Sequence, residues 1–262
     1  MQWSTRVVLQ AVPDIPLVRP GDRLDQLLLA ALERAGLQLE SGDLITLASK
    51  VVSRAEDRYR DLSAVQPGPD AIALAEETGK EPALVQLILD ESVATSRVAP
   101  GVLIVRHRLG IVSANAGIDR SNARPPYASP NSGPWALLLP EDPDRAARAL
   151  REQLERRTGL RLGVIITDSL GRPFRLGTVG AALGVAGPAA LWDRRGAMDL
   201  HGRALEHTTV ALGDQIAAAA DMVAGQADEA RPAIIVRGLR WEPAPDTSAR
   251  DLTRPPDKDL YA

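Results

Sequence analysis

The fold is decided by residues 161–187, which read RLGVIITDSLGRPFRLGTVGAALGVAG. Residues 162–167 are an apolar run rich in β-branched side chains, a pattern typical of a buried strand. Asp168 and Ser169 follow this run directly, and a carboxylate and a hydroxyl at the mouth of a strand are typical hard-oxygen ligands for Mg²⁺ or Mn²⁺. We therefore expect a buried strand that leads into a ligand-binding loop. The alternative is a strand that ends in an exposed carboxylate and a glycine-rich connector.

The residues beyond Ser169 fit a phosphate-bearing ligand. Gly171 would let the backbone come close to a ligand, and Arg172 and Arg175 could neutralise phosphate. Glycines then alternate with small apolar residues, at Gly177, Gly180, Gly184 and Gly187. This alternation predicts a backbone that packs tightly against another element.

Composition limits the classes of protein that the chain can belong to. Its 262 residues are enough for one large domain or two small ones, and 45% hydrophobic and 25% charged residues are ordinary for a globular protein. A net charge of −3 and an aromatic content of 3% argue against a nucleic-acid partner. Because the chain has no cysteine, thiolate nucleophiles, disulfides and cysteine-bound metals are excluded.

Nothing in the sequence predicts a membrane partner. The first twelve residues, MQWSTRVVLQAV, lack the apolar segment of a signal peptide. No apolar run reaches the roughly 18 residues that a membrane-spanning helix needs. We therefore expect a cytoplasmic protein.

The hydrophobic patterns along the chain predict mixed strands and helices, an α+β fold. Strands are expected at residues 6–11, 43–48, 102–106, 110–114, 135–139 and 233–236, and helices at residues 22–36, 70–78, 81–92, 142–159 and 208–223. Proline, glycine and serine mark candidate linkers near residues 63–70 and 124–134. The tail, residues 241–262, is expected to be irregular.

Motif tests exclude several chemistries. The P-loop pattern GxxxxGK[ST], a GxGxxG after the first strand and a GxSxG nucleophile elbow are all absent. The histidines His107, His201 and His207 do not have the spacing of metal ligands. What remains is a dispersed set of oxygen ligands and cations.

This dispersed set lies mostly where a predicted strand or helix gives way to a loop. It comprises Asp119 with Asn122, Asp168 with Ser169, Gln226, and the residues 49–54, SKVVSR. If the fold brings these residues together, they would hold one or two divalent ions and a nucleotide triphosphate. Such a site favours phosphoryl transfer, in which ions and cations stabilise charge more than any nucleophile does.

Several segments resemble one known family. They are NAGIDRSN at residues 115–122, GVIITDS at 163–169, GRPFR at 171–175, DLHGRAL at 199–205, GQ at 225–226 and VRG at 236–238. In this order they resemble the coenzyme F420-0:L-glutamate ligases, or γ-glutamyl ligases, from residue 15 to about residue 238. The chain is similar to the stand-alone form, a single ligase unit over residues 1–262.

The resemblance implies a reaction in coenzyme F420 biosynthesis. GTP would phosphorylate the terminal carboxylate of the F420 precursor to an acyl phosphate, which the amine of L-glutamate then attacks. Later rounds would extend a γ-linked glutamate tail. The resemblance also implies an α+β fold of two interleaved subdomains and a homodimer.

The resemblance further implies a set of site residues. Asp119 and Asp168 match the ligands of one divalent ion, Mg²⁺ or Mn²⁺, and Ser169 and Gln226 match those of a second, with K⁺ as a further ion to consider. Arg172 joins Asp119 and Asp168 as an expected catalytic residue. The expected GTP contacts are Ile15, Pro16, Leu17, Val18, Ser49, Lys50, Arg54, Asn122, Ala224, Gly225, Gln226, Ala227, Asp228, Glu229, Ala230 and Arg231.

Two positions depart from the family pattern. Arg54 stands where some relatives have Lys, which keeps the charge and changes its geometry. Lys50 stands where some relatives have Thr, so its contact with the nucleotide does not follow from the resemblance.

Two other functions stay open on the residues alone. A metal-dependent phosphohydrolase would use the same carboxylates to activate water. A nucleotide-binding regulatory module without chemistry would use Asp119 and Asp168 only as loop caps.

Overall fold

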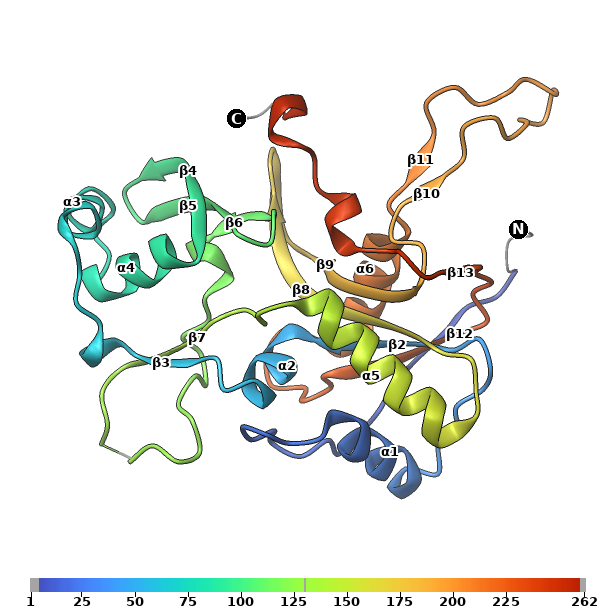
Figure 1. The fold of residues 1–262 in the computed structure, drawn as a ribbon, viewed down its shortest axis with the longest axis horizontal. Coiled ribbons are helices and arrows are strands. Elements are labelled where there is room, and N and C mark those ends of the chain that lie inside the picture. The colour runs from blue at the N-terminus through green and yellow to red at the C-terminus, as the bar shows by residue number, and fades with distance from the viewer. Residues whose placement is uncertain (1–4, 130, 260–262) are drawn as a thin grey trace.

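The computed structural model describes residues 5–129 and 131–259, which form two parts that lie side by side (Figure 1). The larger part is built on a mixed sheet, and the smaller part lies between β3 (Tyr59–Asp61) and β7 (Trp135–Leu137). The expected α+β combination of strands and helices is confirmed.

A six-stranded sheet forms the centre of the larger part. In spatial order its strands are β1 (Val8–Ala11), β12 (Ala233–Arg237), β2 (Leu44–Ala48), β8 (Gly163–Arg172), β9 (Arg175–Pro188) and β13 (Pro243–Ala244). Strands β2 and β8 are parallel, and the other neighbouring pairs are antiparallel. The carboxyl ends of β2 and β8 therefore open at the same edge of the sheet.

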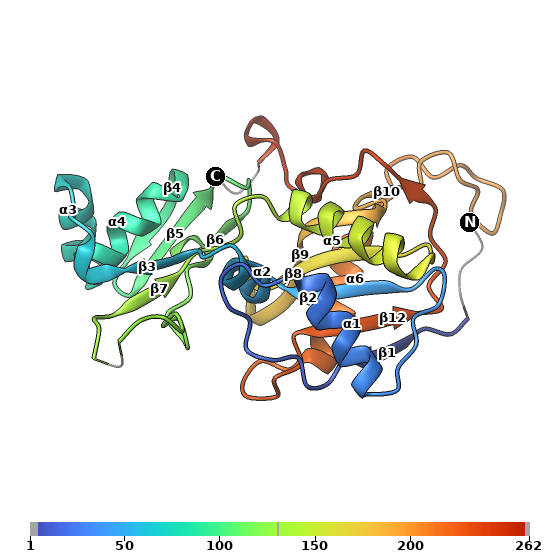
Figure 2. The same ribbon diagram turned by 60° about the horizontal axis from the view of Figure 1, so that its bottom comes forward.

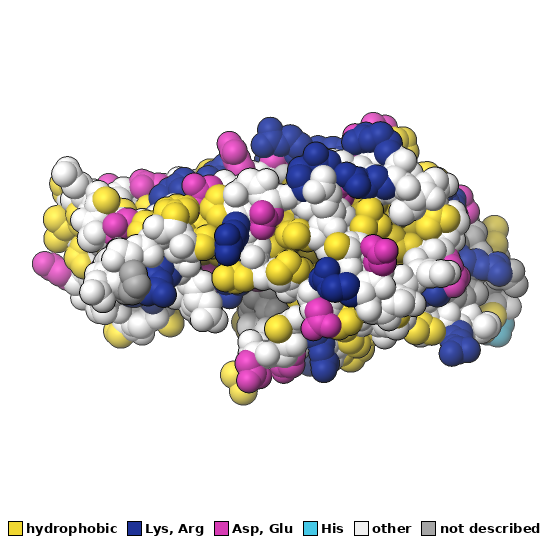
Figure 3. Space-filling model, turned by 90° about the horizontal axis from the view of Figure 1, so that it is seen from below, with side chains coloured by type: hydrophobic (Ala, Val, Ile, Leu, Met, Phe, Trp, Pro, Cys, Tyr) yellow, Lys and Arg dark blue, Asp and Glu magenta, His cyan; other side chains and the backbone are white. Residues whose placement is uncertain are grey.

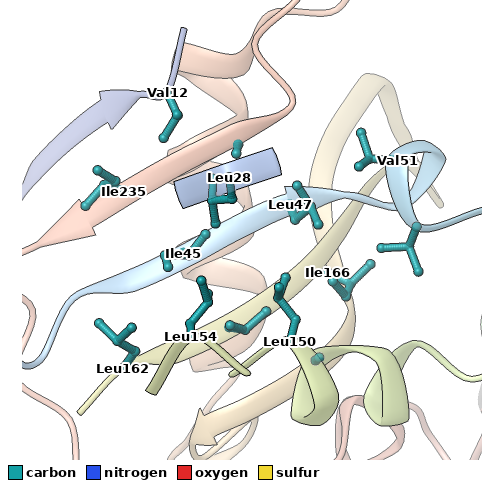
Figure 4. Packing of buried hydrophobic residues seen from close by; sticks show 14 of the residues in the cluster. Val12, Leu28, Ile45, Leu47, Val51, Leu150, Leu154, Leu162, Ile166 and Ile235 are labelled. Carbon is teal, nitrogen blue, oxygen red and sulfur yellow. The ribbon is translucent and has the colours of Figure 1, made fainter. Parts of the chain in front are cut away.

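The central strands are apolar throughout because both faces of the sheet are covered. Ile45 and Ile166 point into a cluster with α1 (Leu24–Arg34) and α5 (Pro143–Thr158), as Figure 4 shows. Their neighbours Leu44 and Ile165 point to the other face, where α6 (Leu212–Ala224) packs. A short helix, α2 (Ser49–Ala55), follows β2 without a loop.

Strand β8 is longer than the sequence predicts. It continues through Asp168 and Ser169, which pair with Ala181 and Gly180 of β9. The expectation that these two residues lie in a loop after the strand is wrong, because the glycine-rich segment that follows is itself a strand. A register shift between Ile166 and Thr167 marks a bulge just before Asp168.

The tight packing predicted for the glycines of β9 is confirmed at Gly180, Gly184 and Gly187, but it is wrong at Gly177, where nothing lies within 4 Å of an added Cβ. A Cβ at Gly180 would lie 2.5 Å from the carbonyl oxygen of Ala217 in α6. A Cβ at Gly184 would lie 2.2 Å from the carbonyl oxygen of Pro143, where α5 begins. The two glycines thus let one helix on each face lie directly on the strand.

The smaller part has its own sheet and hydrophobic cluster (Figure 2). Its elements are η1 (Leu62–Ala64), α3 (Pro69–Thr78), α4 (Pro82–Asp90), β4 (Ser92–Ala99), β5 (Val102–His107), β6 (Val112–Ala114) and η2 (Asn115–Gly117). The expected hairpin at β5 and β6 is confirmed, and β4 is a strand that the sequence did not predict. The candidate linkers at 63–70 and 124–134 lie in this part, with residue 130 outside the described residues, and the division into subdomains stays a prediction.

An arm and a tail complete the larger part. The arm is a hairpin of β10 (Trp192–Asp193) and β11 (Thr209–Val210) that projects from the body in Figure 1. The tail holds η3 (Ala249–Leu252) and η4 (Pro256–Lys258), and it is tied down by a 2.9 Å hydrogen bond from Trp241 Nε1 to the carbonyl of Gly42. Residues 260–262 of the predicted tail lie outside the described residues. No helix in the described ranges is long and apolar enough to cross a membrane.

Candidate active site

A cleft of about 470 Å³ opens where β2 ends, beside the middle of the longer parallel strand β8. Its walls are the segment before α1, the first turns of α2, the middle of β8, the end of α6 and the loop that follows α6. Seen from below, the surface is hollowed near the junction of the two parts (Figure 3). The volume of the cleft is in the range of small-molecule sites, and open α/β sheets bind ligands at the carboxyl ends of their strands.

Most of the residues expected in the site line this cleft. They are Ile15, Pro16, Leu17, Val18, Ser49, Lys50, Arg54, Asp168, Ser169, Ala224, Gly225, Gln226, Ala227, Glu229, Ala230 and Arg231. The described residues of the lining do not include Asp119, Asn122, Arg172 or Asp228. Arg172 is exposed at the far end of β8.

Asp119 is connected to the cleft by an ion pair with Lys50, which lines it. Its backbone is fixed against β7 by hydrogen bonds in both directions with Leu137. One carboxylate oxygen accepts hydrogen bonds from the N–H and the hydroxyl of Ser121, at 2.6 and 2.7 Å, and the other forms an ion pair with Lys50. Burial by itself raises the pKa of Asp119, but Lys50 and Ser121 outweigh it and hold the pKa below its usual range.

Asn122 is held beside the cleft by its backbone. Arg54, one turn after Lys50 in α2, donates a hydrogen bond of 3.1 Å to the carbonyl oxygen of Asn122. The Nε atom of Arg54 is buried and has no hydrogen-bond partner among the described residues. A guanidinium at the wall of the cleft is therefore only partly satisfied by the protein.

Asp168 has too little positive charge around it. The carboxylate is half-buried and accepts a 2.8 Å hydrogen bond from the N–H of Ser169. Burial, helped by the charge of Asp119, raises the pKa of Asp168 to about 6, because the hydrogen bonds from Ser169 and Ser49 and the charge of Lys50 only partly offset these two effects. The charge of Asp119 therefore acts in the same direction as burial and disfavours the ionised form of Asp168.

Asp221 is a cleft residue that the sequence reasoning missed. It lies in the last turn of α6. Its Oδ1 accepts two hydrogen bonds, from Gln226 Nε2 at 2.6 Å and from Ser169 Oγ at 3.4 Å. It thus connects the two side chains expected at a second ion. The only signal for it in the sequence is an isolated acid among the alanines of the helix.

The loop after α6 folds back on itself at Gly225. This residue has φ +79°, and a Cβ there would lie 2.2 Å from the side chain of Glu229. Glu229 in turn accepts a 2.8 Å hydrogen bond from the N–H of Ala227. Glycine is therefore needed for the loop to close one wall of the cleft.

The donor set of the site fits a hard divalent ion. Two carboxylates, a hydroxyl and an amide oxygen are ligands that Mg²⁺ and Mn²⁺ accept, and the raised pKa of Asp168 indicates missing positive charge. Within the described ranges, no three acidic or histidine side chains meet at one point. Phosphate oxygens and water would have to supply the remaining ligands, as is usual for Mg²⁺.

Comparison with known proteins identifies the chain as a ligase. A profile of the family described as F420-0:Gamma-glutamyl ligase matches residues 14–238, and the chain belongs to this family. Curated relatives named coenzyme F420:L-glutamate ligase include that of Methanopyrus kandleri, 47% identical over 97% of this chain and 96% of the relative. That of Methanothermobacter thermautotrophicus is 44% identical over 97% and 98% of the two chains, and that of Methanocaldococcus jannaschii 40% over 95% and 94%.

The family sets aside the two alternatives left open by the residues. A ligase is neither a phosphohydrolase nor a regulatory module without chemistry. The resemblance read from the sequence motifs is confirmed over nearly the same range of residues.

Proposed function

We propose that this ligase uses GTP to join L-glutamate to a coenzyme F420 precursor through an acyl phosphate. The observation that carries the proposal is the placement of two carboxylates at one cleft with cations in its wall: Asp168 lines the cleft, and Asp119 is paired with Lys50 of the same lining. Such a site lacks the positive charge that a metal-bound triphosphate brings. Membership of the family supports the choice of substrates.

In this proposal Asp119 and Asp168 hold one divalent ion, and Ser169 and Gln226 hold a second, with Asp221 beside them. Mg²⁺ or Mn²⁺ bound there would bridge phosphate oxygens and offset their charge. The link from Ser169 through Asp221 to Gln226 supports the second group, because it shows that these side chains already converge. K⁺ remains a further proposed ion.

The cations of the wall would bind the triphosphate. Lys50, Arg54 and Arg231 line the cleft and bring positive charge to it from two sides, α2 and the loop after α6. The apolar residues 15–18 form another part of the wall and would cover the nucleoside. Arg172, exposed further along β8, would attract the acidic precursor to the same edge of the sheet.

We also propose that the ligase acts as a homodimer in the cytoplasm. The arm and the end of the β8–β9 hairpin carry exposed apolar side chains, with Leu176 at 98%, Leu200 at 101% and Met198 at 66% exposure. Apolar groups of this size on projecting hairpins suit contact with a second copy. Both GTP and glutamate are metabolites of the cytoplasm, which supports that location.

The proposal is tested by incubating the protein with GTP, Mn²⁺, the F420 precursor and L-glutamate, followed by mass spectrometry. We expect a product heavier by one or more glutamyl residues, and release of GDP and phosphate in step with it. Leaving out glutamate should stop product formation. Phosphate release at an undiminished rate without glutamate or precursor, and with no glutamylated product in the full mixture, would contradict the proposal.

A further inference from the structure

Lys50 lines the cleft and forms an ion pair with Asp119. Among the described residues, no other cation of the cleft lining forms an ion pair with a carboxylate. Its ammonium contacts Asp119 Oδ2 and lies 3.3 Å from the hydroxyl of Ser121. The other oxygen of Asp119 is occupied by two hydrogen bonds from Ser121. A divalent ion that binds Asp119 must therefore replace Lys50 or crowd against it.

The same lysine also lines the cleft that we assign to the nucleotide. Lysine is a flexible point charge on a four-carbon stem, so its ammonium can change partner without a change in the backbone. Its side chain is 35% exposed and that of Asp119 29%, which leaves both within reach of an incoming ion and of solvent.

We propose that Lys50 is a stand-in cation, which neutralises Asp119 until the divalent ion arrives and then transfers to the triphosphate. This inference rests on the proposed metal site. In this role Lys50 is a positioning residue that makes the metal and the nucleotide bind more tightly together than either binds alone.

The coupling follows from which charges are left without a partner. When the metal binds alone, it displaces Lys50 and leaves an ammonium next to a divalent ion. When the nucleotide binds alone, it draws Lys50 away and leaves Asp119 facing a triphosphate. When both bind, Asp119 contacts the metal and Lys50 contacts phosphate, so every charge has a partner. Such coupling is reciprocal and is ordinarily about 5- to 150-fold in affinity.

Arg54 offers a matched control on the same helix. It is a cation one turn from Lys50 and lines the same cleft, but it donates to the backbone carbonyl of Asn122 instead of a carboxylate. Removing Arg54 changes the charge of the cleft by the same amount without releasing Asp119. Lys50→Arg keeps the charge and tests whether the charge itself is responsible.

The test is the affinity for Mn²⁺, measured by electron paramagnetic resonance with and without the non-hydrolysable imido analogue of GTP. Without the analogue, Lys50→Met should bind Mn²⁺ at least about fivefold more tightly than the wild-type protein, the low end of ordinary coupling. The gain in Mn²⁺ affinity that the analogue brings should shrink in Lys50→Met. Arg54→Met and Lys50→Arg should bind Mn²⁺ alone within about twofold of the wild-type protein. Lys50→Gln repeats the measurement if Lys50→Met does not fold, as judged by thermal unfolding.

The outcomes separate this inference from the proposed function. Unchanged or weaker Mn²⁺ binding by Lys50→Met, in a wild-type background that binds Mn²⁺, overturns the stand-in role and leaves the metal site in place. An equal gain in Arg54→Met also overturns it, because the effect would then be one of general charge. A wild-type protein that binds no Mn²⁺, with or without the analogue, overturns the metal site and the role of Lys50 with it.

Discussion

Two buried or half-buried carboxylates, Glu91 in the smaller part and Asp168 in the cleft, have opposite surroundings. Glu91 accepts hydrogen bonds from Arg58 at 2.9 and 3.0 Å and from Arg108 at 3.1 and 3.2 Å. The Nε2 of His107 lies 3.3 Å away, and the Nδ1 of this histidine accepts from the N–H of Leu109, which leaves the proton on the nitrogen that faces Glu91. Burial alone raises the pKa of Glu91, but these three side chains lower it to about 2.

Among the described residues, Asp168 has no such set of cationic partners. Its pKa is raised to about 6 by burial and by Asp119, since Lys50, whose charge lowers the pKa of Asp168, is paired with Asp119. The comparison teaches that this chain neutralises a structural carboxylate completely and leaves a cleft carboxylate short of positive charge. Titratable groups with such unmet needs are typical of functional sites.

The largest expected effect is that of Asp168→Asn on ligation. We expect the rate to fall at least about 100-fold, comparable with the loss of one charge-stabilising group in an active site. The melting temperature of the metal-free protein at pH 7 should be unchanged or slightly higher. At this pH Asp168 is ionised with too little positive charge around it, and the substitution removes its charge. Both are measured on the same sample, and near-wild-type turnover would remove Asp168 from the site.

Glu91→Gln should show the reverse pattern. It leaves Arg58 and Arg108 without their counter-charge, and breaking a buried ion pair in this way typically costs about 3–5 kcal/mol of stability. Ligation per folded molecule should stay near that of the wild-type protein. Urea unfolding gives the stability, and Asp193→Asn, which breaks the exposed pair with Arg195, is the control that should change little. Equal losses in both variants would mean that burial does not distinguish the two pairs.

Gly180→Ala tests the wall of the cleft that Asp221 forms. The new methyl group would meet the carbonyl of Ala217 at 2.5 Å and push α6 away from β9, and overpacking of this kind costs roughly 1–3 kcal/mol. Gly171→Ala in the neighbouring strand is the control, since nothing lies within 4 Å of the added Cβ. Differential scanning calorimetry measures both. If the two variants have the same melting temperature, α6 does not pack on Gly180 as described.

The smallest effect is on the pH dependence of stability in the metal-free protein. Glu91 has a folded pKa of about 2 against an ordinary value of 4.5, so its contribution is present above pH 4.5 and is lost as the pH falls towards 2. Asp168 has a folded pKa of about 6 against 3.8, so its contribution is present below about pH 4 and is lost as the pH rises through 6.

Urea unfolding between pH 3 and pH 7, with a chelator present, separates the two carboxylates. Relative to the wild-type protein, Asp168→Asn should gain stability as the pH rises from about 4 to 6, and the difference should then stay constant. Glu91→Gln should be less stable than the wild-type protein above pH 4.5, and this difference in stability should shrink as the pH is lowered below 4.5. Parallel curves for all three proteins would show that neither carboxylate is perturbed in the way described.

The sequence alone determined the buried strands and named most of the residues that line the cleft. Strands β2, β8 and β12 contain apolar runs that require burial on both faces of the sheet. Such a run can be recognised in a short stretch of sequence. Asp119, Asp168, Ser169 and Gln226 belong to contiguous motifs, which is why they could be named before the fold was known. The close packing of most glycines of β9 was also predicted, because alternation with small residues is visible in the chain.

Only the tertiary structure decided how these residues meet. The sequence does not show β9 as a strand, because its glycines have little intrinsic preference for one, and pairing with β8 alone makes it extended. For the same reason Asp168 lies within a strand and is half-buried. Asp221 carries no motif and joins the cleft because α6 packs on Gly180.

The pairing of Lys50 with Asp119 depends on the two parts of the molecule together. Lys50 follows a strand of the larger part, and Asp119 is held against β7, the strand after the smaller part. Local sequence dictates each residue's backbone, but the charge that each side chain meets comes from a segment far away in the chain. The types of residue in the site could therefore be predicted, whereas their electrostatic state could not.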